Sequence, residues 1–153
     1  MADKVTVRDF LKLKGKKKIV MITAYDYPTS KVISEISEVD SILVGDSLGM
    51  VVYGLPNTLG VTLDMMVRHT EAVARAKPRQ LIVADMPFLT YEASVAEAVK
   101  NAGELARAGA EAVKLEGGEE VADVVKAIVR AGIPVVGHIG MTPQRFLRLG
   151  GFR

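Results

Sequence analysis

Polar and charged side chains follow one another at or near the ends of five short apolar runs in this chain of 153 residues. They are Tyr25 and Asp26, Asp46 and Ser47, Asp85, Lys114 with Glu116, and His138. Three carboxylates among them, Asp46, Asp85 and Glu116, would repel one another at close range unless a cation lay between them. Oxygen ligands are those that hard divalent ions prefer. The pattern therefore predicts a site for Mg²⁺ or a similar ion.

Lys114 and Glu116 are separated by one residue within a single apolar run. In a β-strand such a spacing places both side chains on the same face. Val113 and Leu115 then take the other face, which we expect to pack against helices. Because buried charges need partners or a metal, the charged face is expected to look into the more enclosed side of the sheet.

Each of these residues also has a simpler interpretation. Asp46 could cap the loop that follows it, and Asp85 could be an acid in a turn. Lys114 and Glu116 could form an ordinary salt bridge, and a lone histidine such as His138 is commonly a hydrogen-bonded core residue. Their shared place at the ends of successive runs favours one functional site over separate explanations.

The runs themselves have the length and composition of buried strands. They are near-continuously apolar and rich in Val and Ile, which is typical of parallel strands covered on both faces. The five predicted strands cover residues 18–25, 41–47, 81–88, 112–118 and 133–140.

Helical patterns separate the runs. Predicted helices cover residues 7–14, 29–37, 62–78, 94–109 and 119–132. The pairs Thr6 with Asp9 and Ser94 with Glu97 have the spacing of helix-capping boxes. His69 is assigned to a helix surface. Strands that alternate with helices predict a parallel sheet with right-handed crossovers.

Two architectures accept this order of elements, a doubly wound sheet of five strands or part of an eight-stranded barrel. A complete five-stranded domain would cover its last strand with a helix, but no long amphipathic pattern follows residue 140. We therefore expect residues 1–153 to form a single domain, an incomplete barrel truncated at its C-terminal side. In both architectures ligands bind at the carboxyl ends of the strands.

Composition excludes several other classes of protein. Apolar residues make up 49% and charged residues 25%, as in ordinary globular proteins. The absence of cysteine excludes disulfides and thiolate metal sites. A net charge of +2, with one dense basic stretch at residues 12–18, does not favour a nucleic-acid surface. Without a signal peptide or a long apolar run, we expect a cytoplasmic protein with no membrane partner.

At this point the sequence resembles a known family. The segments that carry the resemblance are TAYDYPTSK, LVGDSLGMVVYG, VTLDMMVRHT, VADMPFLTY, AVKLEGG and VVGHIGMTPQ. They follow one another as they do in the ketopantoate hydroxymethyltransferase family. The similarity extends over residues 6–153, so no single short motif carries it.

The resemblance implies a (β/α)₈ TIM barrel of the phosphoenolpyruvate/pyruvate superfamily, of which this chain supplies an N-terminal helix and five strands. It implies transfer of a hydroxymethyl group from 5,10-methylenetetrahydrofolate to 3-methyl-2-oxobutanoate, which gives 2-dehydropantoate in the first step of pantothenate biosynthesis. It also implies a homo-oligomer, commonly a decamer.

The resemblance further assigns roles to individual residues. The implied Mg²⁺ ligands are Asp46, Asp85 and Glu116, the last directly or through water. The implied contacts of the 2-oxo acid are Asp46, Ser47, Asp85, Lys114 and, lining the pocket, His138. The glutamate that acts as the catalytic base in the family lies beyond Arg153. The chain alone is therefore expected to be inactive or nearly so.

Three alternatives remain open from the sequence. A lyase of the same superfamily, acting on a phosphorylated or dicarboxylic 2-oxo acid, would present a similar metal site. A receiver-like signalling module also has five strands, acids and a lysine, although receivers place the lysine after the fifth strand and Lys114 lies in the fourth. The third alternative is a non-catalytic half-barrel that associates with itself.

Overall fold

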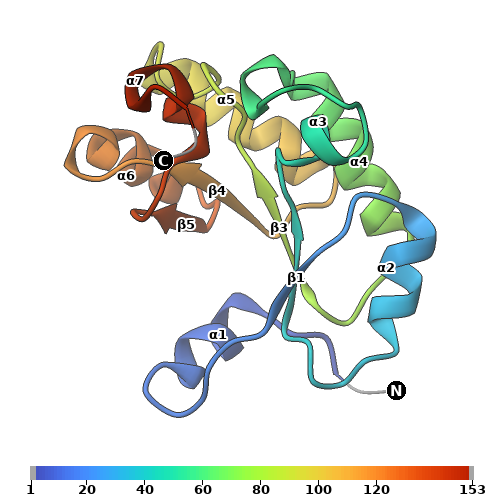
Figure 1. Cartoon of the computed structure of the whole chain (residues 1–153). Coiled ribbons are helices and arrows are strands. Elements are labelled where there is room, and N and C mark those ends of the chain that lie inside the picture. The colour runs from blue at the N-terminus through green and yellow to red at the C-terminus, as the bar shows by residue number, and fades with distance from the viewer. Residues whose placement is uncertain (1–2, 152–153) are drawn as a thin grey trace.

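Five parallel strands form one sheet in a computed structural model of the chain, which describes residues 3–151 (Figure 1). The strands are β1 (Met21–Thr23), β2 (Ser41–Val44), β3 (Leu81–Asp85), β4 (Ala112–Glu116) and β5 (Val135–His138). Each lies within one of the predicted apolar runs. The prediction of five strands is therefore confirmed, with shorter bounds than the runs suggested.

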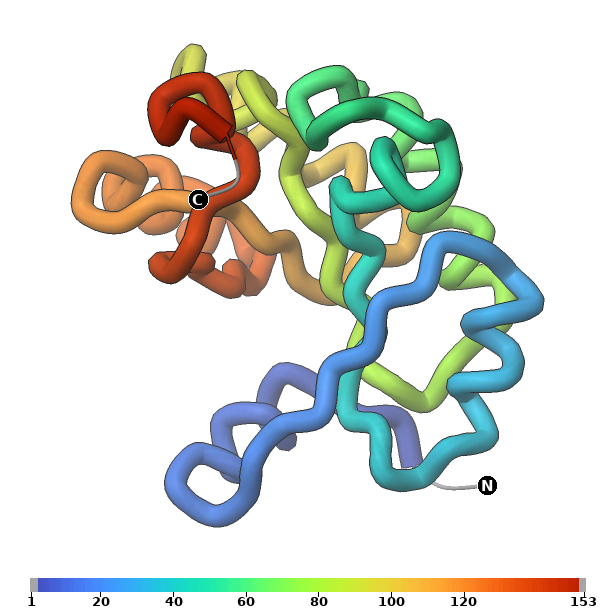
Figure 2. The backbone as a smooth tube through the Cα atoms, viewed as in Figure 1, coloured from blue at the N-terminus to red at the C-terminus, as the bar shows by residue number. Residues whose placement is uncertain are grey.

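The order of strands across the sheet follows their order in the chain, from β1 to β5. Every neighbouring pair is parallel. A doubly wound sheet reverses its strand order at a switch point, whereas a barrel adds each new strand beside the last. The sheet thus has the topology of a barrel segment, and Figure 2 shows the chain advancing along it from the blue first strand to the red C-terminal end.

The predicted helices are all present. They are α1 (Val7–Leu13), α2 (Tyr27–Ser34), α4 (Leu63–Arg75), α5 (Val95–Arg107) and α6 (Ala122–Arg130). Helices α2, α4, α5 and α6 lie on one side of the sheet, and α1 lies on the other (Figure 1). None of the helices described over residues 3–151 is long and apolar enough to span a bilayer.

The predicted helix at residues 119–132 begins with a 3₁₀ turn, η2 (Glu119–Val121), ahead of α6. Four shorter helical segments were not predicted, namely α3 (Leu48–Val51), α7 (Phe146–Leu149) and the 3₁₀ turns η1 (Thr58–Gly60) and η3 (Pro143–Arg145). All four follow the carboxyl ends of strands β2 or β5. Segments of three or four residues are too short for apolar periodicity to reveal.

One of the two predicted capping boxes is complete. Thr6 begins α1, where its hydroxyl accepts a hydrogen bond from the Asp9 N–H and its own N–H donates to the Asp9 carboxylate. Ser94 begins α5 by accepting from the Glu97 N–H at 3.2 Å. Within the described residues Glu97 does not return a bond to Ser94, so the second box is only half formed.

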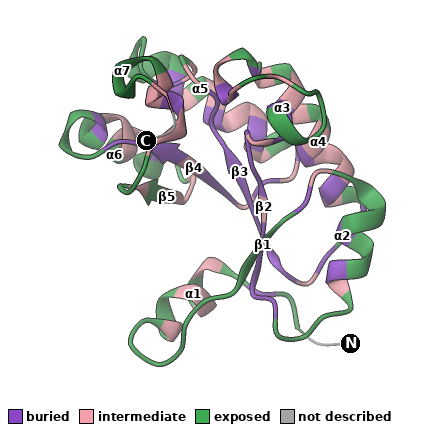
Figure 3. Ribbon diagram, viewed as in Figure 1, coloured by how far each residue is buried: buried purple, intermediate pink, exposed green. Residues whose placement is uncertain are grey.

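The main core lies between the sheet and its outer helices. Outward-facing strand residues such as Ile82, Ala84, Val113 and Leu115 pack there with buried residues of the helices. The latter include Ile33, Met66, Val73, Ala98, Ala102, Leu105 and Ile128. Figure 3 shows this burial in purple along β2, β3 and β4. As predicted, Val113 and Leu115 face helices.

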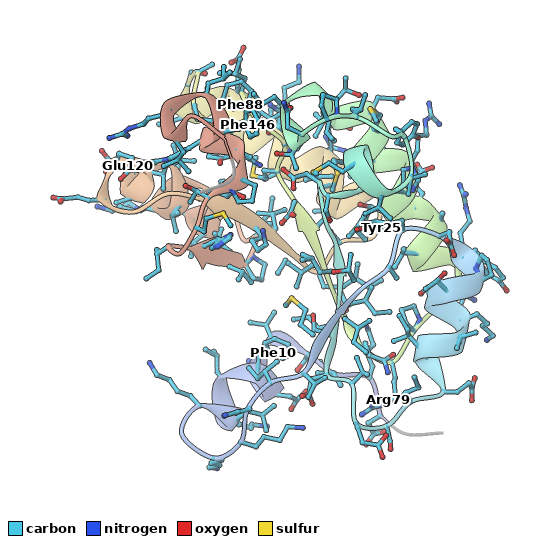
Figure 4. All side chains as sticks on the ribbon, viewed as in Figure 1. Phe10, Tyr25, Arg79, Phe88, Glu120 and Phe146 are labelled. Atoms are coloured by element: carbon cyan, nitrogen blue, oxygen red, sulfur yellow. The ribbon has the colours of Figure 1, made fainter. Side chains whose placement is uncertain are left out.

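A second, smaller core lies on the opposite face of the sheet. Leu81, Val83 and Ala112 form it with Val5. Partly buried side chains pack against them, among them Phe10 of α1, which extends from its helix toward the strands (Figure 4). Helix α1 therefore covers the amino end of the face that would become the interior of a barrel.

Candidate functional site

The inner face of β3 and β4 changes from apolar to charged along each strand. Alternation of side chains brings Leu81, Val83 and Asp85 to this face of β3, and Ala112, Lys114 and Glu116 to the same face of β4. The register pairs Asp85 with Lys114, and Glu116 with His138 of β5. The apolar residues lie at the amino end and the charged ones at the carboxyl end, where the site was predicted.

Asp85 receives two contacts from neighbouring strands. The Nζ atom of Lys114 lies 2.5 Å from its Oδ1, and the backbone N–H of Asp46 donates to its Oδ2 at 3.0 Å. Both side chains of the ion pair are largely buried. Lys114 therefore pairs with Asp85 of the adjacent strand, and the interpretation of Lys114 and Glu116 as a simple salt bridge is wrong.

Gln144, which was given no role from the sequence, is the centre of the hydrogen bonds at this site. Its Nε2 donates to Asp46 Oδ2 at 2.8 Å and to the Met86 carbonyl at 2.9 Å. Its backbone N–H donates to Glu116 Oε2 at 3.0 Å. It comes from the η3 turn after β5, a segment that was quoted only for its family resemblance.

Tyr91 was also missed. Its hydroxyl lies 2.6 Å from Gln144 Oε1 and accepts a hydrogen bond from the Glu116 N–H at 3.1 Å. Burial raises the pKa of the Tyr91 hydroxyl, so the group keeps its proton at neutral pH. No signal in the sequence separates this tyrosine from a core residue.

Two acids of the site, Asp46 and Glu116, lie in surroundings that disfavour their charged forms. Burial, and after it the charge of Asp85, raises the pKa of Asp46 to about 7. Burial also raises the pKa of Glu116. Removing a carboxylate from water penalises its ionised form, so a cation beside these residues would stabilise them.

The predicted metal ligands fit a divalent cation by their chemistry. They are oxygen donors on adjacent strands, and Asp85 Oδ1 is buried with the Lys114 ion pair but without a hydrogen bond of good geometry. Over residues 3–151, however, no group of three acidic or histidine side chains is close enough to enclose an ion. The assignment of Asp46, Asp85 and Glu116 as metal ligands stays a prediction.

Ser47 takes part in a separate set of contacts. Its hydroxyl lies 2.8 Å from that of Tyr25, which lies at the carboxyl edge of the sheet on the α4 side (Figure 4). His69 Nδ1 lies 2.5 Å from the Tyr25 carbonyl oxygen, and its Nε2 lies 3.0 Å from the Tyr53 hydroxyl. His69 lies on α4 as expected and is half-buried, and its ring in addition connects the loops that follow β1 and β2.

His138 lies at the rim of the site. Its side chain is 34% exposed, and its Nδ1 lies 3.8 Å from Glu116 Oε1. The interpretation of His138 as a buried core histidine is wrong at this exposure. Its position beside Glu116 agrees with a residue that lines a pocket.

A cavity of about 210 Å³ adjoins Glu116 and Gln144. Its lining also includes Phe88, Tyr91 and Val124 of α6. Phe88 and Glu120 border this region in Figure 4. There is thus open space directly beside Glu116, one of the three predicted metal ligands.

Comparison with known proteins gives concordant results. A model of the family described as ketopantoate hydroxymethyltransferase matches residues 4–153. Proteins named 3-methyl-2-oxobutanoate hydroxymethyltransferase from Staphylothermus marinus and Saccharolobus islandicus are 68% and 71% identical. Each alignment covers 98% of this chain and 55% or 56% of the relative. The chain therefore spans about half the length of these curated relatives.

Solved structures share the fold. One is 2,3-dimethylmalate lyase, described as a member of the PEP mutase/isocitrate lyase superfamily, which matches with a TM-score of 0.63 at 18% identity. The match covers 87% of this chain and 53% of that one. Together with the sequential strand order, this likeness identifies the sheet as part of a TIM barrel.

Proposed function

This chain belongs to the ketopantoate hydroxymethyltransferase family, and from that premise we propose that it provides the 2-oxo acid and metal site of such an enzyme. The reaction transfers a hydroxymethyl group from 5,10-methylenetetrahydrofolate to 3-methyl-2-oxobutanoate and gives 2-dehydropantoate. It opens the pantothenate pathway. The proposal extends to a cytoplasmic, homo-oligomeric enzyme, on the strength of the family resemblance.

The observation that carries the proposal is the array of Asp46, Asp85 and Lys114 at the carboxyl end of three adjacent strands. In this proposal Asp46, Asp85 and Glu116 hold Mg²⁺. When bound, Mg²⁺ supplies Lewis acidity toward the oxygens of a 2-oxo acid. The raised pKa of Asp46 supports this assignment, because it arises from burial and from repulsion by Asp85, which a bound cation would offset.

Other residues bind and orient the substrate. Lys114 lies within the charged face, where it offsets the substrate carboxylate and the negative charge that develops when the C3 proton leaves. Ser47, held by Tyr25, orients the substrate by a hydrogen bond, and His138 lines the pocket. The carbon that has lost its proton then bonds to the methylene carbon of the folate. Both carbon–nitrogen bonds of that methylene break, water supplies the hydroxyl oxygen, and tetrahydrofolate leaves with the two protons released.

We also propose that the 153 residues alone turn over slowly or not at all. The resemblance places the proton-abstracting glutamate outside them, and general-base catalysis typically contributes ~10²–10⁴-fold. Turnover at the rate of a whole hydroxymethyltransferase would contradict this part of the proposal.

The competing functions are less well supported. A receiver-like module is wrong for this topology, because receivers have a doubly wound strand order and this sheet is sequential. A lyase of the superfamily shares the fold at 18% identity. The identity of 68–71% to hydroxymethyltransferases favours the transferase.

Calorimetry tests the proposed site directly. The purified chain is titrated with Mg²⁺ in the presence of 3-methyl-2-oxobutanoate, alongside Asp46→Ala. Asp64→Ala is a matched control, since Asp64 is an acid on the exposed surface of α4 that pairs with Arg68. We expect binding that needs both ligands, survives in the control and is lost in Asp46→Ala. Equal binding by Asp46→Ala would contradict the site.

A further inference from the structure

Gln144 connects segments that are far apart in the sequence. Its three donated hydrogen bonds reach Asp46 after β2, Met86 after β3 and Glu116 at the end of β4. Its side chain is buried, with 4% exposure for the residue. The η3 turn that carries it is tied to the loop after β4 by an ion pair between Arg145 and Glu120.

The side-chain amide of Gln144 has all its hydrogen-bonding groups in use. The two hydrogens of Nε2 go to Asp46 Oδ2 and the Met86 carbonyl, and Oε1 faces the Tyr91 hydroxyl. Reversing the amide would place Oε1 against a carboxylate and a carbonyl oxygen, which are both acceptors. Only one of the two orientations of the carboxamide therefore suits this site.

Tyr91 selects that orientation. A hydroxyl has one proton to donate. Because the Tyr91 oxygen accepts from the Glu116 N–H, its proton is available for Gln144 Oε1, the closest acceptor at 2.6 Å. A fully satisfied, buried polar network of this kind holds its members in one arrangement.

The network fixes one oxygen of each carboxylate. Asp46 is held through Oδ2 by the Gln144 side chain, and Glu116 through Oε2 by the Gln144 backbone. The Asp46 N–H in turn donates to Asp85. The second oxygens, Asp46 Oδ1 and Glu116 Oε1, take no part in these bonds, and Glu116 Oε1 lies 3.8 Å from His138 Nδ1.

We propose that Gln144 is a positioning residue that sets the carboxylates of Asp46 and Glu116 relative to each other, with Tyr91 fixing the orientation of its carboxamide. This inference rests on the proposed function, in which those carboxylates bind a divalent cation. Gln144 is assigned no bond to the ion in this proposal. It acts through the acids that bind the ion.

The second glutamine of the chain supplies a matched control. Gln80 is also fully buried, and its Nε2 donates to two carbonyls, those of Ile33 and Ile36, at 3.0 Å each. It lies at the amino end of β3, away from the acids. Gln80→Met and Gln144→Met therefore each remove a buried amide with two donated hydrogen bonds, and Gln144→Met also removes the bond that Oε1 accepts from Tyr91.

The first readout is affinity for Mn²⁺, measured on the chain by electron paramagnetic resonance, with Mn²⁺ standing in for Mg²⁺. Loss of a residue that orients metal ligands typically costs about 10- to 100-fold in metal affinity. We expect a loss in that range for Gln144→Met, a smaller one for Tyr91→Phe and less than twofold for Gln80→Met. Tyr91 is expected to act on the carboxylates only through its hydrogen bond to Gln144. The double variant Gln144→Met/Tyr91→Phe should therefore bind Mn²⁺ no more weakly than Gln144→Met. An unchanged affinity in folded Gln144→Met overturns the proposal.

The second readout needs no metal. The side-chain NH₂ of Gln144 should show slow hydrogen exchange by NMR in the metal-free chain, and faster exchange in Tyr91→Phe. If the chain binds no Mn²⁺ but this protection is present and depends on Tyr91, the metal part of the proposed function fails and the positioning network stands. If the amide exchanges like an exposed one, the positioning proposal fails, whatever the metal affinity.

Discussion

The two ends of the same strands differ in what they bury. At the amino end of β3 and β4, Leu81 and Ala112 pack under α1 with Val5. Four residues further along each strand, Asp85 and Glu116 occupy the same face. One end is an apolar core, and the other is a set of charges that are only partly compensated. The amino end thus contributes packing, and the carboxyl end carries the candidate functional site, as in TIM barrels.

The difference shows that burial alone does not define a core. Asp85 and Glu116 are as buried as several members of the apolar cluster, with 4% and 5% exposure against 9% for Val5. What separates the two ends is whether each buried group finds a partner of the right kind. Stability should therefore fall when packing is removed at the amino end, and it should change when a charge is removed at the carboxyl end.

The largest effect is expected from Lys114→Met. This change removes the cation 2.5 Å from Asp85 and leaves a buried carboxylate uncompensated. Breaking a buried pair from one side typically costs about 3–5 kcal/mol, so we expect a loss of about 4 kcal/mol in the free energy of unfolding. Urea denaturation in EDTA measures it.

Lys4→Met provides the matched control for that variant. Lys4 and Glu111 form an ion pair of the same 2.5 Å length at the amino end, but both side chains are more than 30% exposed. Exposed pairs contribute about 0–1 kcal/mol. Equal losses of unfolding free energy in Lys114→Met and Lys4→Met would contradict the greater cost of an unpaired charge at the carboxyl end.

The next effect is expected from Leu81→Ala, at the amino end. Leu81 is buried in the small core with Val83 and Ala112. Truncating a buried leucine costs about 3 kcal/mol through lost burial and the cavity that remains. Stability should fall in urea while the Mn²⁺ affinity of the folded chain stays unchanged. A large change in that affinity would mean that the two ends are coupled.

Asp46→Asn should stabilise the protein at high pH. The pKa of Asp46 is raised from 3.8 to about 7, so the folded chain holds this proton more tightly than the unfolded chain does. Wild-type stability is therefore favoured below pH ~4 and falls as the pH rises toward 7. We expect the variant to escape this fall and gain roughly 2 kcal/mol at pH 8.

Urea denaturation of both chains at pH 4 and pH 8, in EDTA, tests that prediction. The gain should be small at pH 4, where Asp46 is protonated in the folded wild type. A variant that is less stable than wild type at pH 8 would contradict the inference that the ionised Asp46 carboxylate destabilises the folded chain. Metal affinity should fall in the same variant, which would link the penalty to function.

The smallest effect is expected from Thr6→Ala. This change removes the hydroxyl that begins α1 and its reciprocal bonds with Asp9. The loss should be about 1 kcal/mol, and Thr6→Ser, which keeps the hydroxyl, should restore most of it. Thermal unfolding followed by circular dichroism measures both. An unchanged transition in Thr6→Ala would show that α1 adds little to the amino-end core.

The sequence by itself determined the five strands, their main helices and the charged residues at the strand ends. These features depend on local patterns, namely continuous apolar runs, helical spacing and caps such as that of Thr6. Alternation within one strand was also sufficient to place Lys114 and Glu116 on one face. The resemblance of the sequence to its family added the expected roles of Asp46, Asp85 and His138.

The tertiary structure alone decided which of these groups meet. Lys114 pairs with Asp85 because the register of β3 against β4 aligns them, and nothing within either strand specifies that register. Gln144 reaches Asp46 across 98 positions of sequence. A buried glutamine shows no periodicity and carries no charge, so its role depends wholly on the partners that the folded chain brings to it.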